Sequence, residues 1–277
     1  MAHYFEALSQ LNGTEMIEVL LLHNAPNDKE LEIINAYLPT LDFVSHIVIE
    51  ERESLYATWN RGIHLAEGEY ITIWNVDDVR FPESVLWQSR ALDNHPQAMI
   101  AYGDIWVSKE YGVCGKTRTY SLENNLKKDF FHSYHMGCFQ MWRKSLHEKI
   151  GYYDEQFKCS ADFDFQVRAA IHYPLVKVNN VLGIYLEDQP HKLSANKEQE
   201  LENNIIYLRY KVFQKINYLT LRASLQRYKK DKLLFYGNWQ VFQEESPFGL
   251  IYKIRGLSLG FVKIFYYVAK RIRDAIS

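Results

Sequence analysis

Three oxygen-bearing side chains follow one short apolar run of this chain. Asn75, Asp77 and Asp78 come directly after Tyr70–Trp74, where aromatic and β-branched residues predict a strand. Open α/β sheets bind ligands at the carboxyl ends of their strands. Mg²⁺ takes oxygen ligands and often shares one or two carboxylates with the phosphates of a substrate. The pattern therefore predicts a cation and phosphate site, with Asp77 and Asp78 as the metal ligands.

An ordinary turn explains the same residues. Asp and Asn are favoured in turns, and Phe81–Pro82 is typical of a loop that leads into a helix, because Pro is favoured at the first helical position. On this segment alone, both interpretations stay open.

The residues around this segment resemble the central signature of the family 2 glycosyltransferases, which have the GT-A fold and use sugar nucleotides. In that family N-x-G-x-x-x-A-x-G-x-Y-I precedes a D-x-D-D cluster. This chain has the same pattern at Asn60, Gly62, Ala66, Gly68, Tyr70 and Ile71. The resemblance implies Mg²⁺ or Mn²⁺ at Asp77 and Asp78, and donor contacts from Asn60, Asn75 and Asp77. Asn75 replaces the first acid of the cluster; its amide still hydrogen-bonds a ribose hydroxyl or coordinates a metal, without charge.

A second stretch, residues 143–168, resembles the other signature of the family. It contains R-K-S-L-x-x-x-I-G-x-x-D-E-x-F and then A-D-F-D-F-x-x-R. The family usually has E-D-x-D-L-x-x-R here, with the second acid as the catalytic base. The resemblance therefore implies that Asp162 is the base, with Asp164 at the next acid and Ala161 in place of the Glu. The alternative is an acidic first turn stabilised by the helix dipole, which the sequence favours if this stretch is taken alone.

Inverting transfer requires such a carboxylate. An acceptor hydroxyl must be held in line with the leaving group and must lose its proton as it attacks. A carboxylate on the face opposite the leaving group accepts that proton without a covalent intermediate. A metal at Asp77 and Asp78 offsets the charge that develops on the departing diphosphate.

The resemblance adds further donor contacts. Asp28 keeps the only carboxylate in H-N-A-P-N-D, where the family has an acid that holds the nucleobase. Asp104 lies in a strand like the family's Y-G-D strand, near the donor sugar; a solvent-exposed Asp is the alternative. His191, with Lys192 and Ser194, lies in a segment like the family's closing loop, which reaches the diphosphate. An ordinary charged loop explains that segment equally.

Other candidates have ordinary explanations. Trp59 stands where the family commonly has Arg, and it either stacks on the base or packs in the core. His132 and His135 fall in the region of the family's acceptor loop. A lone His is more often an ordinary hydrogen-bonded residue than a ligand.

One departure from the family concerns the sheet. The family begins with a strand and a P-T-Y-N-like turn before its first helix, whereas this chain begins at the helix. The strand is lost, another segment or chain fills its place, or the sequence is a truncated form. Losing a central strand exposes backbone groups on its neighbours, so we expect some compensation.

The composition excludes several classes of function. The chain has 277 residues, of which 47% are hydrophobic, and a net charge of −2. It is long enough for a sizeable core, and its overall charge does not favour nucleic acid. Three cysteines without metal-ligand spacing favour a reduced, cytoplasmic protein. We recognise no signal peptide and no apolar run long enough to span a membrane.

Alternating apolar runs and amphipathic segments predict an α/β fold, a GT-A-like, Rossmann-type and mostly parallel sheet flanked by helices. We expect a glycosyltransferase domain over residues 1–195 and a helical extension over 196–277. A single helix over Glu198–Ile216 begins that extension.

Residues 247–277 form a basic tail with six Lys or Arg and one Asp. Its apolar stripe between basic residues predicts a helix that lies on an anionic membrane. The alternative is a helix that docks on the catalytic domain or on a second subunit. We therefore expect a cytoplasmic protein with peripheral contact at the inner face of the membrane.

These patterns together predict an inverting glycosyltransferase that moves a sugar from a nucleotide donor, expected to be a UDP-sugar, to a glycan or lipid-linked acceptor. The expected setting is the synthesis of cell-surface polysaccharide. A catalytically silent, glycosyltransferase-like scaffold is one alternative, and Trp59, Asn75 and Ala161 favour it. A nucleotidyltransferase is another, although we find no Gly-rich phosphate loop near the N-terminus.

Overall fold

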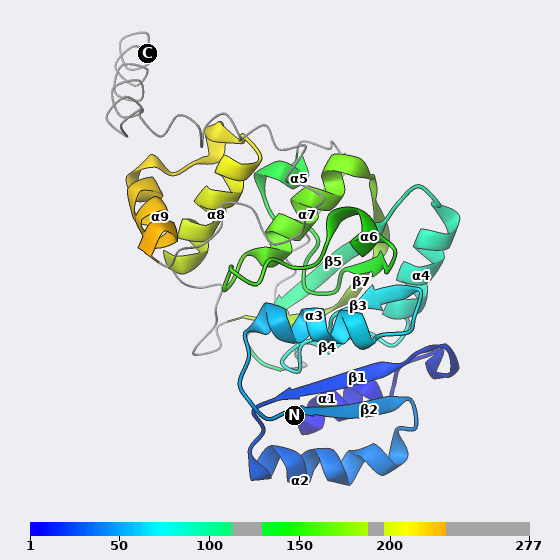
Figure 1. The fold of residues 1–277 in the computed structure, drawn as a ribbon. Helices are drawn as coiled ribbons and strands as arrows, with labels where there is room; N and C mark the ends of the chain where they lie inside the picture. Colours follow the sequence, from blue (N-terminus) through cyan, green and yellow to red (C-terminus); the bar gives the residue numbers. More distant parts are fainter. Residues whose placement is uncertain (112, 114–128, 188–196, 231–277) are drawn as a thin grey trace, which may run out of the picture. The chain divides into compact units, whose positions relative to one another are not determined.

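The computed structural model describes residues 1–111, 113, 129–187 and 197–230 (Figure 1). The chain divides into two compact units, Met1–Val241 and Phe242–Ser277. The predicted boundary at residues 195/196 stays a prediction. The predictions for His191, its neighbours Lys192 and Ser194, and the basic tail fall outside the described residues. None of the helices in the described part of the chain is both long and apolar enough to cross a membrane.

The strands form two sheets. In the first, β1 (Val19–Asn24) and β2 (Val44–Ile49) pair in parallel. The second has the order β3-β6-β5-β7-β4, and its strands are β3 (Tyr70–Thr72), β4 (Val79–Arg80), β5 (Ile100–Ser108), β6 (Met141–Arg143) and β7 (Leu175–Leu186). The long β5–β7 pairing is parallel, while the short pairings of β3, β4 and β6 are antiparallel. The predicted α/β class is confirmed, with a sheet of mixed direction.

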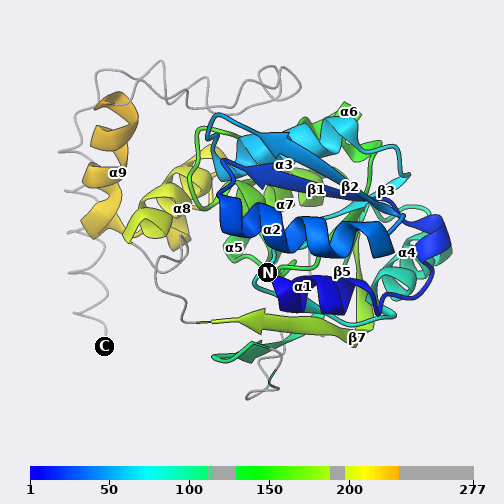
Figure 2. The same cartoon turned by 90° about the horizontal axis from the view of Figure 1, so that it is seen from below.

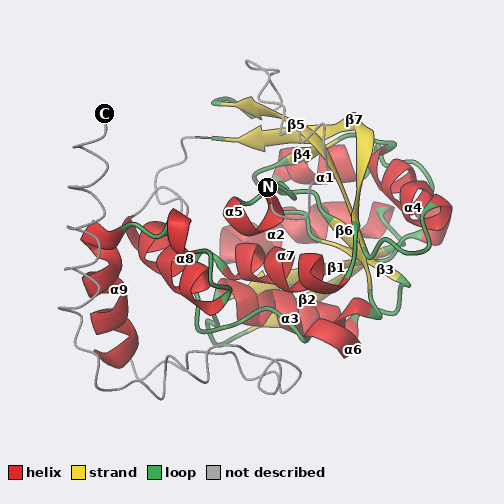
Figure 3. Cartoon of the chain, turned by 90° about the horizontal axis from the view of Figure 1, so that it is seen from above, coloured by secondary structure: helices red, strands yellow, loops and turns green. Residues whose placement is uncertain are grey.

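Helices pack beside both sheets, and β5 and β7 lie at the outer edge in the view of Figure 3. The helices are α1 (Ala2–Leu8), α2 (Asp28–Tyr37), α3 (Leu55–Leu65), α4 (Ser84–Asn94), α5 (Asp129–His132), α6 (Leu146–Ile150), α7 (Ala161–His172), α8 (Lys197–Arg209) and α9 (Tyr218–Lys230). Local sequence fixes several of their starts. Asn27 and Glu30 form a capping box at α2, and the Ser54 hydroxyl accepts from the Ala57 N–H at the start of α3.

Helix α1 connects the two sheets. Its residues Tyr4, Phe5 and Leu8 are buried in one cluster with Leu21 of β1. Tyr4 also meets the ring of Trp74, just after β3, edge to face at a centroid distance of 4.9 Å. Figure 2 shows α1 beside α2, while α3 lies on the other side of β1 and β2 in Figure 1. Among the described residues no strand joins β1 to β3, and α1 bridges the two sheets by apolar packing instead.

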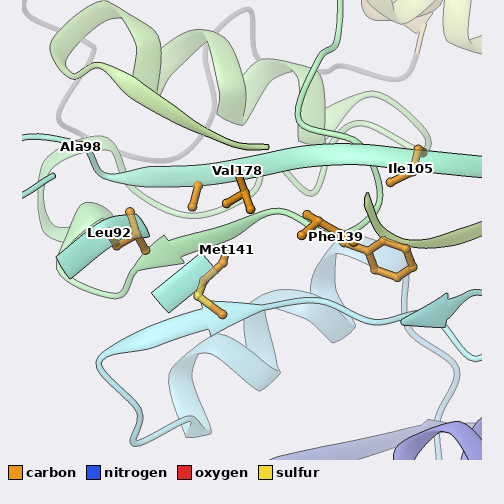
Figure 4. Packing of buried hydrophobic residues seen from close by; sticks show 8 residues of the cluster. Leu92, Ala98, Ile105, Phe139, Met141 and Val178 are labelled. Atoms are coloured by element: carbon orange, nitrogen blue, oxygen red, sulfur yellow. The ribbon is translucent and has the colours of Figure 1, made fainter. Parts of the chain in front are cut away.

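The core of the five-stranded sheet lies against α4 (Figure 4). Leu92 of α4 packs on Ala101 and Ile105 of β5, together with Phe139. The approach of β4 to β7 depends on Gly183, because a Cβ there would lie 2.2 Å from the Val79 carbonyl oxygen. Such an overlap is not tolerated in a close-packed interior.

Helix α8 is shorter than the sequence predicts. Its end at Arg209 is fixed by Lys211, whose backbone is left-handed with φ 58°. The Val212 N–H donates to the Tyr207 carbonyl oxygen at 2.8 Å, the 6→1 bond of a Schellman motif. Gly usually occupies the left-handed position, and Lys gives no such signal. The single helix predicted over 198–216 is therefore wrong in its extent, and α9 is a separate helix.

Candidate active site

The turn after β3 presents Asn75 and Asp77. The Asp78 N–H donates to the Asn75 carbonyl oxygen at 3.1 Å and closes this turn. The side chains of Asn75 and Asp77 are half-buried and have no hydrogen bond or ion pair with the described residues. An unpaired carboxylate beside an amide oxygen is a suitable place for a hard cation.

Asp78 is built into the sheet instead. It is 1% exposed, and its Oδ1 accepts from the N–H of Leu186 at the end of β7, at 3.2 Å. Burial lowers the pKa of the nearby Arg80 guanidinium to about 10, and the Asp78 carboxylate is among the groups that oppose this shift. One oxygen of this predicted metal ligand is thus committed to β7. Asp77, the other carboxylate of the turn, makes no such hydrogen bond with the described residues.

Asp162 lies on the first turn of α7. Burial raises the pKa of its carboxyl to about 6. The Phe163 N–H and the Tyr56 hydroxyl both donate to its Oδ1, at 2.8 and 3.4 Å, and oppose this shift. A carboxylate with a pKa near 6 is ionised at neutral pH and binds a proton more readily than an ordinary Asp, which suits a general base.

A cavity of about 220 Å³ lies beside Asp162. Three elements contribute its walls: the segment after α5, the start of α7 and one face of α8. Its lining residues are Ser133, Tyr134, Asp162, Phe163, Gln199, Asn203 and Tyr207. The predicted base therefore faces a space that a small polar molecule can enter.

The two acidic clusters affect the pKa values of Tyr134 and Cys138, which belong to one loop. Burial raises the pKa of the Tyr134 hydroxyl, and the carboxylate of Asp162 adds to that rise. Burial likewise raises the pKa of the Cys138 thiol, with contributions from the carboxylates of Asp78 and Asp77. The carboxylates of both clusters thus raise pKa values within one loop. We infer that Asp162 and Asp77 lie near the same region of the molecule.

The side chain of Asn60 hydrogen-bonds the loop before α7. Its Nδ2 donates to the Tyr153 carbonyl oxygen at 3.0 Å and to Glu155 Oε1 at 2.8 Å, while its Oδ1 accepts from the Tyr153 N–H at 3.0 Å. The amide is thus occupied at both ends. This geometry assigns Asn60 to the connection between α3 and the loop before α7, and its donor contact stays a prediction.

Asp28 and Asp104 lie apart from these contacts. Asp28 is the exposed first residue of α2. Asp104 of β5 forms a salt bridge of 2.9 Å with Lys177 of β7. Within the described residues, no hydrogen bond or ion pair joins either one to Asp77 or Asp162, so both donor contacts stay predictions.

Buried ion pairs of Arg209 fix α8 against α7 and the loop before it. Asp164 accepts from Arg168 at 2.8 Å and from Arg209 of α8 at 3.0 Å, and all three side chains are at most 1% exposed. Arg209 also pairs with Asp154 at 2.7 Å. The carboxylate of Asp164 is consumed in this network, which leaves Asp162 as the acid of α7 that faces the cavity.

Glu202 of α8 holds the loop that leads into α7. Its carboxylate accepts from the N–H groups of Lys158 and Cys159 at 2.7 and 2.9 Å. Burial raises the pKa of Glu202, and these two hydrogen bonds oppose the rise. Helix α8 thereby sets the position from which Asp162 projects.

The minor candidates have ordinary roles. Trp59 packs edge to face on Tyr56 and Tyr153, as core packing requires. His132 hydrogen-bonds Gln214 at 3.0 Å, and neither His132 nor His135 lines the cavity. Burial lowers the pKa of His135, as expected for a neutral packed imidazole.

A metal would need ligands beyond the described protein residues. No group of three or more His, Cys, Asp or Glu side chains is placed to hold an ion by itself, within the residues the structure describes. The oxygens of Asp77 and Asn75 nevertheless fit a cation that shares the phosphates of a substrate, because Mg²⁺ is commonly held by one or two carboxylates plus phosphate oxygens.

Tyr111 and the cavity face of α8 were not recognised from the sequence. The Tyr111 hydroxyl is buried without a hydrogen-bond partner in the described residues. Burial raises its pKa to about 12, with contributions from the carboxylates of Asp78, Glu6 and Asp77. Nothing in the sequence distinguishes Tyr111 from the other tyrosines of the chain.

Sequence comparisons give the family. The model of the glycosyl transferase family 2 matches residues 4–151. An uncharacterized glycosyltransferase of Methanocaldococcus jannaschii is 26% identical over 201 residues, 71% of this chain and 69% of that protein. A PGL/p-HBAD biosynthesis glycosyltransferase of Mycobacterium bovis is 26% identical over 57% of this chain and 60% of its own length.

Solved structures share the fold. S. aureus TarS in complex with UDP-GlcNAc superposes with a TM-score of 0.59 at 15% identity, over 73% of this chain and 61% of the TarS chain. A mannosyltransferase of Pyrobaculum calidifontis in complex with GDP-Man and Mn²⁺ gives 0.58 at 11% identity, over 84% of this chain and 72% of its own. The GT-A expectation for the fold is confirmed. Because the family model covers more than half of the chain, this protein belongs to the glycosyl transferase family 2, as its two signatures predict.

Proposed function

We propose that this protein is an inverting, metal-dependent glycosyltransferase in which Asp77 holds the metal and the donor diphosphate and Asp162 is the base. One observation carries the proposal: a carboxylate with a pKa near 6 lines a cavity, while the turn after β3 offers a half-buried carboxylate without a partner in the described residues. The carboxylates of Asp77 and Asp162 have different roles because their surroundings differ.

The reaction follows from this arrangement. An acceptor hydroxyl in the cavity attacks the anomeric carbon of the donor sugar, and its oxygen forms the new bond. The bond from that carbon to the diphosphate breaks on the opposite face, and the nucleoside diphosphate leaves. The acceptor proton passes to Asp162. Tyr56 and the Phe163 N–H keep the carboxylate in place for this transfer.

The donor end depends on the turn after β3. Asp77, with the amide oxygen of Asn75, would hold a divalent cation, and that cation would offset charge on the departing diphosphate. A UDP-sugar is the donor we propose. UDP-GlcNAc bound to TarS supports this choice, and Mn²⁺ with GDP-Man in the Pyrobaculum enzyme supports the need for a metal.

The wider setting rests on the family. We propose a glycan or lipid-linked acceptor, with a role in the synthesis of cell-surface polysaccharide at the inner face of the membrane. A relative named for PGL/p-HBAD biosynthesis supports an acceptor of this kind.

Calorimetry tests the donor site. UDP and GDP are titrated into the protein with Mn²⁺ and with EDTA, and the titrations are repeated with Asp77→Asn and with the exposed control Asp42→Asn. We expect binding that requires Mn²⁺, is lost in Asp77→Asn and is unchanged in Asp42→Asn. Metal-independent binding, or no binding, contradicts the proposal and favours a catalytically silent scaffold.

A further inference from the structure

Helix α8 contributes one wall of the cavity beside Asp162. Gln199, Asn203 and Tyr207 are spaced four residues apart and therefore lie on one face of the helix. All three fall outside residues 4–151, which the family model matches. The family match therefore says nothing about this wall of the cavity.

Polar groups on this wall lack partners. The Oδ1 of Asn203 is buried and has no hydrogen-bond partner among the described residues. The amide of Gln199 likewise makes no hydrogen bond in the described part of the chain. A buried, unpaired oxygen costs free energy, and a hydroxyl donor that enters the cavity satisfies it. Two amides offer both donors and acceptors, which matches a molecule with several hydroxyls.

The described lining residues do not favour a phosphate. The cavity has no Lys or Arg among its described lining residues, and Asp162 makes it negative. A phosphate monoester in contact with Asp162 would have to overcome repulsion without a compensating cation. The rings of Phe163 and Tyr207, edge to face at 5.7 Å, add an apolar wall of the kind that small-molecule pockets use.

We propose that this cavity binds a neutral sugar residue of the acceptor, and that Asn203 and Gln199 select it through hydroxyls next to the one that Asp162 deprotonates. This inference rests on the proposed function. It specifies a sugar hydroxyl, rather than a lipid phosphate, as the group that attacks the donor.

Binding of simple probes tests the inference. The protein is saturated with Mn²⁺ and UDP or GDP. Binding of methyl glycosides of glucose, galactose, mannose and N-acetylglucosamine, and of decyl phosphate, is then measured by saturation-transfer NMR. We expect at least one glycoside to bind and decyl phosphate not to bind. Asn203→Ala should weaken glycoside binding about five- to tenfold, the effect of one neutral hydrogen bond.

Two controls separate recognition from folding. Lys197→Ala removes an exposed side chain at the start of α8 and should leave glycoside binding unchanged. Asn203→Ala should keep the Tm and the nucleotide affinity of the parent, because the lost oxygen has no partner within the described residues. Equal glycoside binding by Asn203→Ala overturns the inference, as does binding of decyl phosphate alone. Normal nucleotide binding with no glycoside binding also overturns it and leaves the proposed function standing. Loss of nucleotide binding in the parent protein overturns both.

Discussion

The hydroxyl of Tyr56 on α3 donates a hydrogen bond of 3.4 Å to Oδ1 of Asp162 on α7, across 106 residues of sequence. This contact joins the helix of the first signature to the acid of the second. Because the hydroxyl favours the ionised carboxylate, it opposes the rise in pKa that burial imposes on Asp162.

Tyr56→Phe should therefore raise the pKa of Asp162 further. A net hydrogen bond contributes about 0.5–1.5 kcal/mol, which corresponds to a shift of up to about one pH unit. The acidic limb of the pH profile of kcat/KM should shift toward higher pH by that amount. Tyr152→Phe is the matched control, since the Tyr152 ring stacks on His147. Superimposable profiles for Tyr56→Phe and the parent protein would show that the contact does not tune Asp162.

Asp162→Asn should stabilise the free protein at neutral pH. Burial raises the folded-state pKa to about 6 from 3.8. The protonated form is therefore favoured by folding, and this stabilisation is present below pH 4 and is lost as the pH rises through 6. Above pH 6 the free energy of unfolding of Asp162→Asn should exceed that of the parent protein by at most about 3 kcal/mol. Thermal unfolding should show a higher Tm for the variant at pH 7.5 and little difference at pH 4. A lower Tm at pH 7.5 contradicts this account of burial.

Asp78→Ala should destabilise the protein, unlike Asp77→Asn. Removing the partner of the buried Leu186 N–H costs about 1–3 kcal/mol. Asp77 has no partner in the described residues, so its substitution should leave the free energy of unfolding unchanged. Urea titrations measure both values. Equal stability of the two variants would mean that Asp78 does not hold β7.

Arg209→Met tests whether α8 belongs to the catalytic unit. The substitution leaves the carboxylates of Asp154 and Asp164 buried without this cation, and breaking a buried pair costs about 3–5 kcal/mol. Denaturant titration should show a loss of this size, with loss of transfer activity at temperatures where the variant unfolds. Arg222→Met changes an exposed cation of α9 and serves as the control. A loss below about 1 kcal/mol would agree with a catalytic domain that ends before α8.

The two acidic clusters were predictable because the residues of each one lie close together in the sequence, within a recognisable motif. Asp162 was identified through the resemblance of its stretch to the family's second signature, and the structure puts it at a cavity. The role of Asp78 was not predictable, since it depends on the end of β7, 108 residues away. Asn203 was also missed, because a polar residue at helical spacing has the same pattern whether it faces solvent or a cavity. Its role becomes visible only when α7 and α8 pack together.

The rate of sugar transfer by Asp162→Asn tests the central claim most directly. The measurement uses saturating nucleotide sugar and the acceptor glycoside identified by binding, with nucleotide affinity determined on the same samples. We expect transfer to fall by at least about 100-fold, the usual contribution of a general base, while the Kd for the nucleotide stays within about twofold of the parent. Transfer within about threefold of the parent rate contradicts the assignment of Asp162 as the base.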